Sequence, residues 1–264
     1  LHDALPIFKP NMILMVPLMI ETFAKKLEDV KDLPEKVVKE AVFGSQFHTI
    51  CSGGAYLNPE YIELFERFGI QILQGYGMTE CSPVISTTVA WNVKKNSVGQ
   101  LLPNCEAKTV DGELWVRGSS VMQGYYKMPE ETKTALKDGW LCTGDLGYVD
   151  EDRFIYLTGR KKNLIITKNG ENVSPEELEN KLSSSRLVQE VLVREAKGVI
   201  EAEIYPDEEY AKKQGLEREE EVRVELQKLI DEYNQGAPAY KKIYSLIIRE
   251  KEFEKTASRK IKRY

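Results

Sequence analysis

The stretch QGYGMTE, residues 74–80, combines residue types that suit a flat ligand bearing phosphates. Its glycines let a backbone approach a ligand closely, and Tyr76 offers an aromatic face to a base. Thr79 offers a hydroxyl to a phosphate, and Glu80 offers the kind of oxygen ligand that Mg²⁺ prefers. Taken alone, the same pattern is equally typical of a tight turn between a strand and a helix. The upstream stretch SGGA, residues 52–55, is by itself more typical of a plain loop.

Two further stretches offer groups that bind sugars and carboxylates. GWLCTGDLG places Asp145 between glycines after an apolar strand, where its carboxylate can accept two hydrogen bonds from a ribose diol. A turn aspartate would have the same pattern. In GRKKN, Arg160 presents a planar fork of donors suited to a ribose or a carboxylate. Lys162 follows in the same basic stretch, between two apolar strands, where a domain boundary would pivot.

The stretch EKTASRKIKRY, residues 254–264, is rich in positive charge although the chain as a whole has a net charge of −5. Its basic residues are Lys255, Arg259, Lys260, Lys262 and Arg263. This composition fits a solvated tail, a grip on nucleic acid, or one lysine that is held ready for chemistry.

The composition excludes several classes of protein. A pI near 5.4 argues against a dedicated nucleic-acid binder, which needs a basic face. Only His2 and His48 are present, which excludes a multi-histidine metal site. Four scattered cysteines without a CxxC spacing predict reduced cytosolic thiols. No apolar run reaches the roughly 18 residues of a membrane span, so we expect a cytoplasmic protein. Peripheral association with the inner face of the membrane stays open.

Helical and strand patterns alternate from residue 11 to about residue 158, which predicts an α/β sheet fold. Residues 58–69 predict a helix, with an asparagine cap and a proline at its start and a glycine at its end. Residues 70–77 predict the buried strand that runs into Gly-Tyr-Gly. Two hairpins follow, turning at residues 111–112 and 150–152.

Beyond the basic stretch the pattern predicts a small α+β domain of roughly 100 residues. A hairpin turns at residues 169–170, and a helix follows with Ser174 as its cap and Glu177 closing a capping box. Two strands come next, then a helix whose apolar residues at 222–233 have a helical period, then a final strand before the tail.

Four stretches occur together in the order and spacing of one family: YGMTE, GWLCTGDLG, GRKKNLIITKNGENVSPEELE and EKTASRKIKR. The chain resembles the adenylate-forming superfamily, which contains acyl-CoA synthetases, nonribosomal-peptide adenylation domains and firefly luciferase. It is most similar to the C-terminal portion of bacterial long-chain fatty acid–CoA ligases. The resemblance implies that residues 1–158 are the C-terminal part of a large AMP-binding domain, 159–163 a hinge, and 164–264 a small mobile domain. Residues 1–7 look non-native.

The resemblance implies a ligase that forms an acyl-adenylate from a fatty acid and Mg-ATP and then a thioester with coenzyme A. ATP, Mg²⁺ and coenzyme A are the implied cofactors and substrates, with no nucleic acid partner. Within the class, a medium-chain or aryl acid, or transfer to the phosphopantetheine of a carrier protein, stays open. Outside the class, the alternative is a nucleotide-binding or nucleic-acid-binding module that uses the basic tail. Oligomeric state is left open.

The resemblance also implies a role for individual residues. The ATP- and AMP-binding residues would be Gly53, Gly54, Ala55, Gly75, Tyr76, Thr79, Asp145, Arg160 and Lys260. The catalytic residues would be Thr79, Glu80 and Lys260, with Glu80 on Mg²⁺. The hinge residue would be Lys162. The coenzyme A tunnel would use Lys168, Asn169, Gly170 and Glu171.

Lys260 matches the family lysine that drives adenylation, because a placed cation stabilises the charge that builds on the carboxylate, the α-phosphate and the leaving pyrophosphate. A flexible tail suits a residue that is used in one half-reaction only. The tail departs from the family pattern at Glu254, where a proline is usual, and at Arg259, where a glycine is usual. The family's upstream Ser/Thr/Gly-rich phosphate loop has no match here, so we expect the chain to be inactive by itself.

Overall fold

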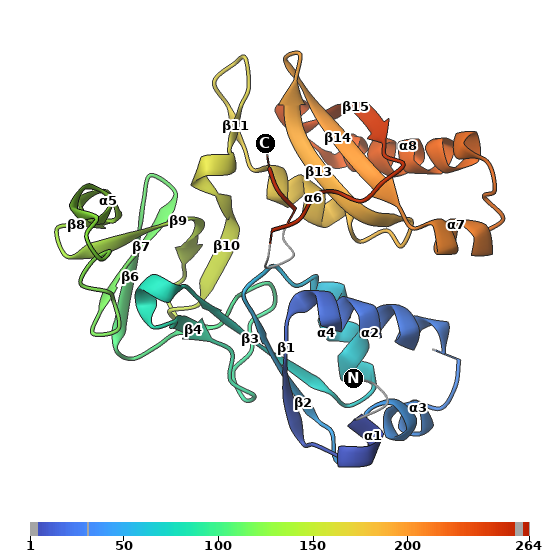
Figure 1. Cartoon of the computed structure of the whole chain (residues 1–264), viewed down its shortest axis with the longest axis horizontal. Coiled ribbons are helices and arrows are strands. Elements are labelled where there is room, and N and C mark those ends of the chain that lie inside the picture. Colours follow the sequence, from blue (N-terminus) through green and yellow to red (C-terminus); the bar gives the residue numbers. More distant parts are fainter. Residues whose placement is uncertain (1–4, 31, 257–260, 264) are drawn as a thin grey trace. The chain divides into compact units, whose positions relative to one another are not determined.

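The computed structural model describes residues 5–30, 32–256 and 261–263. It divides the chain into two compact units, Leu1–Leu157 and Thr158–Tyr264 (Figure 1). The α/β character expected from the alternating pattern is confirmed. None of the helices in the described residues is long and apolar enough to cross a membrane. The predicted catalytic residue Lys260 lies outside the described residues, with the rest of 257–260.

The first unit begins with a five-stranded sheet whose strands follow the order of the sequence. Its strands are β1 (Met12–Met15), β2 (Thr49–Gly53), β3 (Gln71–Gly77), β4 (Val84–Thr87) and β5 (Gln100–Leu101). The first three strands are parallel, and the last two pairings are antiparallel. The helices before β3 are α1 (Leu5–Phe8), α2 (Pro17–Asp29), α3 (Glu35–Val42) and α4 (Pro59–Arg67). Stacked and tilted rings of Phe43, Phe47 and Phe65 fill the core that these elements share.

The residues that the sequence predicts for the start and the end of helix α4 have those roles in the structure. The side chain of Asn58 accepts a hydrogen bond from the Glu60 amide at 3.0 Å, and Pro59 opens the helix. Gly69 has a φ of +64°, so the chain can reverse after the last turn. Phe65 and Phe68 are buried on the face that meets the sheet core, which confirms the predicted apolar face.

A second sheet, in the order β10-β9-β7-β6, follows in the first unit, and its strand β10 continues into the second unit from Thr158 onward. Its strands are β6 (Cys105–Val110), β7 (Glu113–Gly118), β9 (Trp140–Val149) and β10 (Ile155–Arg160), with β8 (Leu136–Lys137) paired to β9. Helix α5 (Pro129–Ala135) precedes β8. The predicted turn at Asp111-Gly112 joins β6 to β7, and both residues have positive φ, as a type I′ turn requires.

The hairpin between β9 and β10 turns at Asp150, as predicted. The Asp150 carboxylate accepts a hydrogen bond from the Phe154 amide at 2.8 Å, which closes the turn. Lys94 donates to the same carboxylate at 2.7 Å and to Asp152 at 2.6 Å. These contacts, the bond from Lys94 foremost, lower the pKa of Asp150 below its ordinary value.

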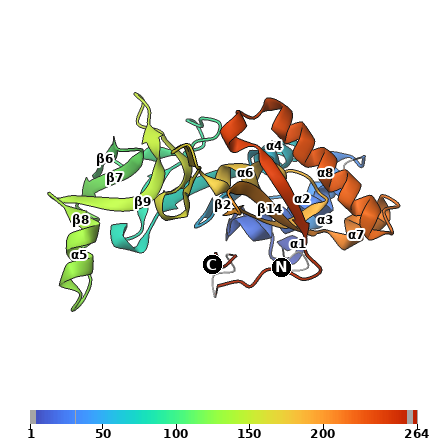
Figure 2. The same ribbon diagram turned by 90° about the horizontal axis from the view of Figure 1, so that it is seen from above.

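The second unit is a three-stranded sheet with helices. Its strands are β13 (Val188–Ala196), β14 (Val199–Pro206) and β15 (Ile243–Ile248). Strand β14 lies in the middle, antiparallel to β13 and parallel to β15. Its other elements are η2 (Lys161–Asn163), the hairpin of β11 (Ile165–Ile166) and β12 (Asn172–Val173), α6 (Pro175–Leu182), α7 (Glu208–Lys213), α8 (Glu219–Gly236) and η3 (Ala239–Lys241). Helices α6 and α8 bury their apolar residues against one face of the sheet, and α8 runs alongside it in Figure 2.

The capping box predicted at the start of α6 is not formed. The side chain of Ser174 makes no cap bond and instead donates to Glu176 at 2.9 Å. Glu177 is drawn away by Lys241, whose ammonium lies 2.7 Å from its carboxylate. A charged partner wins this competition because a charge-assisted bond is stronger than a bond to a backbone amide.

We expect Asp150→Asn to destabilise the first unit at neutral pH, because the amide loses the charge that Lys94 binds. A carboxyl whose pKa is lowered in the fold contributes stability above its ordinary pKa, and this contribution is lost as the pH falls through the lowered value. The melting temperature of the variant should therefore lie below that of the wild type at pH 7, and the gap should close in acid. Thermal denaturation at a series of pH values tests this.

Asp152→Asn is the matched control, since Asp152 shares Lys94 but makes no side-chain bond to the turn amide. It should lower the melting temperature less. A gap between wild type and Asp150→Asn that is the same at every pH would contradict the role of the Asp150 charge.

Candidate active site

Two of the glycine-rich stretches meet at the carboxyl ends of adjacent parallel strands. Gly53 on β2 lies opposite Gly75 on β3. A Cβ atom on Gly53 would stand 2.7 Å from the carbonyl oxygen of Gly75, so the two backbones leave no room for a side chain there. Gly54 follows with a φ of +86°, and Gly54 and Ala55 are exposed. Ligands of open α/β sheets bind at this edge, beyond the carboxyl ends of the strands.

Tyr76 and Asp145, predicted separately for one nucleotide site, are in contact. The Tyr76 hydroxyl donates to Oδ2 of Asp145 at 2.6 Å. The two residues come from β3 and β9, and their exposed fractions are 8% and 4%. The Tyr76 ring packs in a core cluster with Ile85 and Leu114. The contact was not predicted, because the two residues are 69 positions apart in the sequence.

The backbone of Asp145 and of the residues before it is held by hydrogen bonds. The Asp145 amide donates to Oγ1 of Thr143 at 3.1 Å, and that hydroxyl donates to the carbonyl oxygen of Leu114 at 2.7 Å. The amide of Gly144 donates to the buried carboxylate of Glu113 at 2.9 Å. The backbone around Asp145 is therefore held by bonds to the neighbouring strand β7, which fixes where the carboxylate points.

Thr79 and Glu80 lie on a short 3-10 turn, η1 (Thr79–Cys81), between β3 and β4. A Cβ atom on Gly77 would stand 2.0 Å from the carbonyl oxygen of Pro83, so the chain doubles back closely here and only glycine fits. Thr79 is exposed and Glu80 is half-buried. The turn thus presents a hydroxyl and a carboxylate beside each other, as the sequence predicts for a phosphate and a metal.

Sequence reasoning missed Tyr125, which contacts the predicted metal ligand. Its hydroxyl donates to Oε1 of Glu80 at 2.8 Å, and the Met122 amide donates to the Glu80 carbonyl at 2.8 Å. The bond to Glu80, with burial second, raises the pKa of Tyr125. The Tyr125 amide in turn donates to Thr132 of α5 at 2.9 Å. The exposed aromatic pair in GYYK was the available signal in the sequence.

The donor set suits Mg²⁺ bound mainly through a substrate. Glu80 supplies a carboxylate oxygen, and Thr79 supplies a neighbouring hydroxyl. Within the described residues, no group of three or more His, Cys, Asp or Glu side chains could hold a metal ion. Mg²⁺ commonly binds through one or two carboxylates, with substrate phosphates and waters completing its shell. A single carboxylate beside a phosphate-binding hydroxyl fits that arrangement.

The remaining predicted residues belong to the second unit. Arg160 ends β10 and is half-buried, and Lys162 is exposed on η2. Residues 168–171 form the exposed tip between β11 and β12, which confirms the hairpin predicted there. Lys168 lies against Gly198, where an added Cβ atom would come within 2.2 Å of its side chain. Asp145 lies in the first unit and Arg160 in the second. These roles stay predictions.

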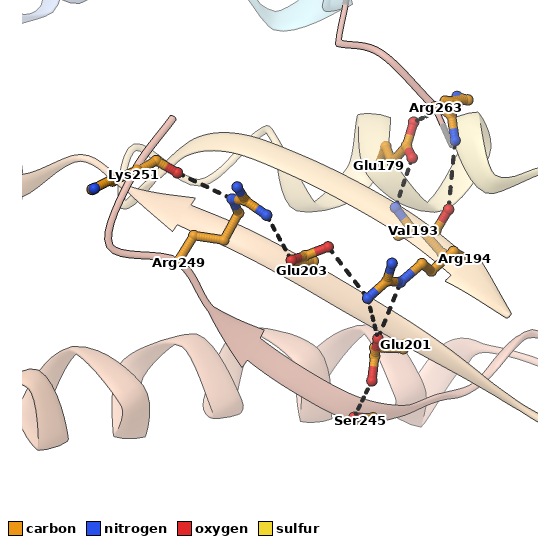
Figure 3. A network of polar contacts seen from close by, with 9 residues as sticks. All are labelled: Glu179, Val193, Arg194, Glu201, Glu203, Ser245, Arg249, Lys251 and Arg263. Carbon is orange, nitrogen blue, oxygen red and sulfur yellow. Dashed lines mark hydrogen bonds and ion pairs between the residues drawn. The ribbon is translucent and has the colours of Figure 1, made fainter. Parts of the chain in front are cut away.

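The basic tail is not a free solvated segment where the structure describes it. Lys255, Lys262 and Arg263 each pair with a glutamate of the second unit. The pairs of Lys255 and Arg263 join the described parts of the tail to β13 and α6, whereas Lys262 pairs within the tail. Glu179 is buried, and a carboxylate withdrawn from water is stabilised by a cation such as Arg263 (Figure 3). The expectation of a flexible tail stays a prediction.

Two family models match the chain. The first is described as AMP-binding enzyme and matches residues 1–126, and the second is described as AMP-binding enzyme C-terminal domain and matches residues 162–264.

Known proteins similar to this chain include ligases for several kinds of acid. A long-chain-fatty-acid–CoA ligase from Mycobacterium bovis is 40% identical over 171 residues, 64% of this chain and 28% of the ligase. A 4-coumarate–CoA ligase-like protein from Oryza sativa is 42% identical over 165 residues, 56% of this chain and 30% of that protein.

Among solved structures, the o-succinylbenzoate CoA synthetase of Bacillus subtilis with its acyl-adenylate intermediate has a TM-score of 0.76 and 28% identity. The match covers 98% of this chain and 51% of the synthetase. The same synthetase has been solved with ATP and magnesium ion. The chain thus spans about half the length of this solved relative and less than a third of the mycobacterial ligase.

We expect Glu80→Gln to lower the pKa of Tyr125 toward its ordinary value. The carboxylate that accepts the tyrosine proton is lost, and a neutral amide no longer opposes ionisation of the phenol. Titration followed by NMR of labelled tyrosine rings would measure the shift, with Tyr125→Phe identifying the signal. An unchanged pKa in Glu80→Gln would contradict the contact.

Proposed function

Since the chain belongs to the adenylate-forming AMP-binding enzyme family, we propose that it activates a fatty acid with Mg-ATP and transfers the acyl group to coenzyme A. In the first step a carboxylate oxygen bonds to the α-phosphorus of ATP, and pyrophosphate leaves. In the second step the thiol loses its proton, its sulfur bonds to the acyl carbon, and AMP leaves. The activity is proposed for the full-length product of the gene.

The observation that supports this proposal best is the meeting of distant motifs in the first unit. Gly53 and Gly75 lie opposite each other on β2 and β3, and the next residue on β3, Tyr76, reaches Asp145 on β9. The glycine-rich ends of β2 and β3 in one sheet thereby lie close to the oriented carboxylate that β9 of the other sheet supplies. In this proposal the edge receives the nucleotide.

Each residue at this edge has a proposed task. The backbone at Gly53, Gly54 and Ala55 lies along the adenine, because no side chain holds the nucleotide away. Asp145 accepts hydrogen bonds from the ribose, and Thr79 donates to a phosphate. Glu80 holds Mg²⁺, which when bound neutralises charge on the phosphate oxygens. Tyr125 keeps one oxygen of Glu80 hydrogen-bonded and so limits how that carboxylate can rotate.

The second unit is proposed to act as the small mobile domain, residues 164–264, with 159–163 as the hinge and Lys162 at its pivot. Arg160 would share the ribose with Asp145. Residues 168–171 would line the path of the pantetheine, since they form an exposed hairpin tip. Lys260 would supply the cation of the adenylation step.

A long-chain fatty acid is the proposed substrate because the mycobacterial relative is a long-chain-fatty-acid–CoA ligase. An aryl acid is the second candidate, because the Oryza sativa and Bacillus subtilis relatives are named for aryl acids. We propose a cytoplasmic protein that meets its apolar substrate at the membrane surface.

Acid-dependent exchange between ATP and pyrophosphate tests the proposed reaction and its substrate together. We expect exchange by the full-length protein to be highest with long-chain acids in a series from acetate to oleate, with benzoate as the aryl representative. A maximum with benzoate would favour the second candidate. A folded full-length protein that gives no exchange with any acid would contradict adenylate formation.

Lys260→Ala should lower adenylation about 10²–10³-fold, the usual cost of removing one transition-state charge partner. Thioester formation from a supplied acyl-adenylate should change little, because the lysine acts in one half-reaction. The two half-reactions are measured separately. Lys251→Ala, at an exposed lysine shortly before the basic tail, is the control. A variant that adenylates normally but loses affinity for a polyanion such as heparin would instead indicate that the tail binds nucleic acid.

A further inference from the structure

The loop that joins β7 to α5 in the first unit contacts Glu80 at two points (Figure 1). The Tyr125 hydroxyl donates to Oε1 of Glu80 at 2.8 Å, and the Met122 amide donates to the Glu80 carbonyl oxygen at 2.8 Å. One contact bears on the carboxylate, and the other bears on the main chain that carries it. The direction of the Glu80 carboxylate therefore depends on where residues 122–125 lie.

This loop lies on the surface of the first unit, so packing alone does not fix its conformation. Tyr125 is 36% exposed, and residues 123–131 are all exposed. A segment with few buried apolar contacts opens easily unless hydrogen bonds hold it. The bonds that restrain the loop therefore decide how well it can hold Glu80.

The side chain of Thr132 on α5 supplies such a restraint. Its Oγ1 accepts a hydrogen bond from the Tyr125 amide at 2.9 Å and donates to the Met128 carbonyl oxygen at 2.7 Å. A hydroxyl has one proton to donate, so the bond to the carbonyl leaves its lone pairs free to accept from the amide. The Met128 amide donates to the Tyr125 carbonyl oxygen at 3.2 Å. Both backbone polar groups of Tyr125 are therefore bonded to the beginning of α5.

The residue before Tyr125 packs closely against the same threonine. A Cβ atom on Gly124 would stand 2.7 Å from Cγ2 of Thr132 and 3.1 Å from its Oγ1. A side chain at position 124 would have to displace the threonine, whose β-branched side chain has few rotamers to choose from. The methyl group and the hydroxyl of Thr132 thus meet two consecutive residues of the loop.

We propose that Thr132 is a positioning residue for Glu80, acting through Tyr125 and the loop that precedes α5. This inference rests on the proposed function, in which Glu80 holds Mg²⁺. Thr132 fixes the backbone of Tyr125, and the Tyr125 hydroxyl then holds one oxygen of the Glu80 carboxylate. A carboxylate that is oriented in advance loses less conformational entropy when it binds, and partners behind a metal ligand tune its affinity for the metal.

The same helix supplies a matched control. Thr134 donates from Oγ1 to the Glu130 carbonyl oxygen, four residues back, at 2.9 Å, as Thr132 does to Met128. Thr134→Val therefore removes a hydroxyl and the same type of helix bond from α5, but it leaves the bond to the Tyr125 amide in place. Thr132→Val removes that bond and keeps the shape of the side chain. Thr132→Ser keeps the hydroxyl.

The first experiment follows two amide protons in the full-length protein without substrates. Hydrogen–deuterium exchange, resolved to single residues, should become about 2–10-fold faster at the Tyr125 amide in Thr132→Val, since that amide loses its acceptor. The Met122 amide, which bonds to Glu80, should become faster as well, because the whole loop is released. Thr132→Ser and Thr134→Val should exchange as the wild type does at both amides.

The Met122 amide decides between a local and a transmitted effect. Faster exchange at Tyr125 alone would overturn the proposal, because the change would then stop at the deleted bond and not reach Glu80. Unchanged exchange at both amides would overturn it too. Should Thr132→Val fail to fold, Gly124→Ala is measured in its place, since its added Cβ atom pushes the loop away from the same threonine.

The second experiment separates positioning from a general loss of structure. It measures how exchange between ATP and pyrophosphate by the full-length protein depends on the concentration of free Mg²⁺. The concentration for half-maximal exchange should rise about 10-fold in Tyr125→Phe, which deletes the bond to Glu80. It should rise less in Thr132→Val, because the phenol is still present. The rate at saturating Mg²⁺ should stay near the wild-type rate in both variants, and Thr132→Ser and Thr134→Val should match the wild type throughout.

A lower rate of Thr132→Val at every Mg²⁺ concentration, with the same midpoint, would overturn the positioning role, because it indicates general damage. A midpoint that rises in Tyr125→Phe but not in Thr132→Val would overturn the role of the threonine. If the wild type adenylates no acid, the proposed function fails. The exchange of the Met122 amide then still decides whether Thr132 holds the turn that carries Glu80.

Discussion

A carboxylate that is buried away from water needs a hydrogen-bond donor or a cation. This requirement determines the polar contacts inside both units. In the first unit it joins Asp145 to Tyr76 across two sheets. In the second it joins Glu179 to β13 and to the tail. Removing the donor leaves a buried carboxylate without that hydrogen bond, which destabilises the fold. Because each pairing links segments far apart in the sequence, satisfying the carboxylates also fixes where the functional segments lie.

Local signals in the sequence predicted most of the elements, because their energetics involve residues only a few positions apart. The Asn58 cap and Gly69 define the ends of α4, and the Asp111-Gly112 pair makes the turn between β6 and β7. The glycine-rich stretches lie at the carboxyl ends of β2 and β3, where we expect a ligand. That edge follows from parallel β2 and β3 ending side by side, which a strand pattern implies once the pairing is known.

The failures concern choices between a local partner and a distant one. Glu177 had a cap bond within reach in the sequence, yet it pairs with Lys241, 64 positions away. Tyr125 and Glu80 are 45 positions apart, and neither residue type demands the other. The pairing of Lys255 with Glu190 and of Arg263 with Glu179 was not predicted, because the positive charge of the tail does not reveal which glutamates it meets. In each case the deciding partner is set by the fold, so no window along the chain contains the information.

Lys255 and Arg263, which lie near the two ends of the basic tail, pair with Glu190 and Glu179, so the number of residues between them matters. A one-residue insertion or deletion between Lys255 and Ile261 would carry the later residues out of step, so that Arg263 could no longer meet Glu179 while Lys255 meets Glu190. Natural variation in this stretch should therefore change residue types far more readily than length.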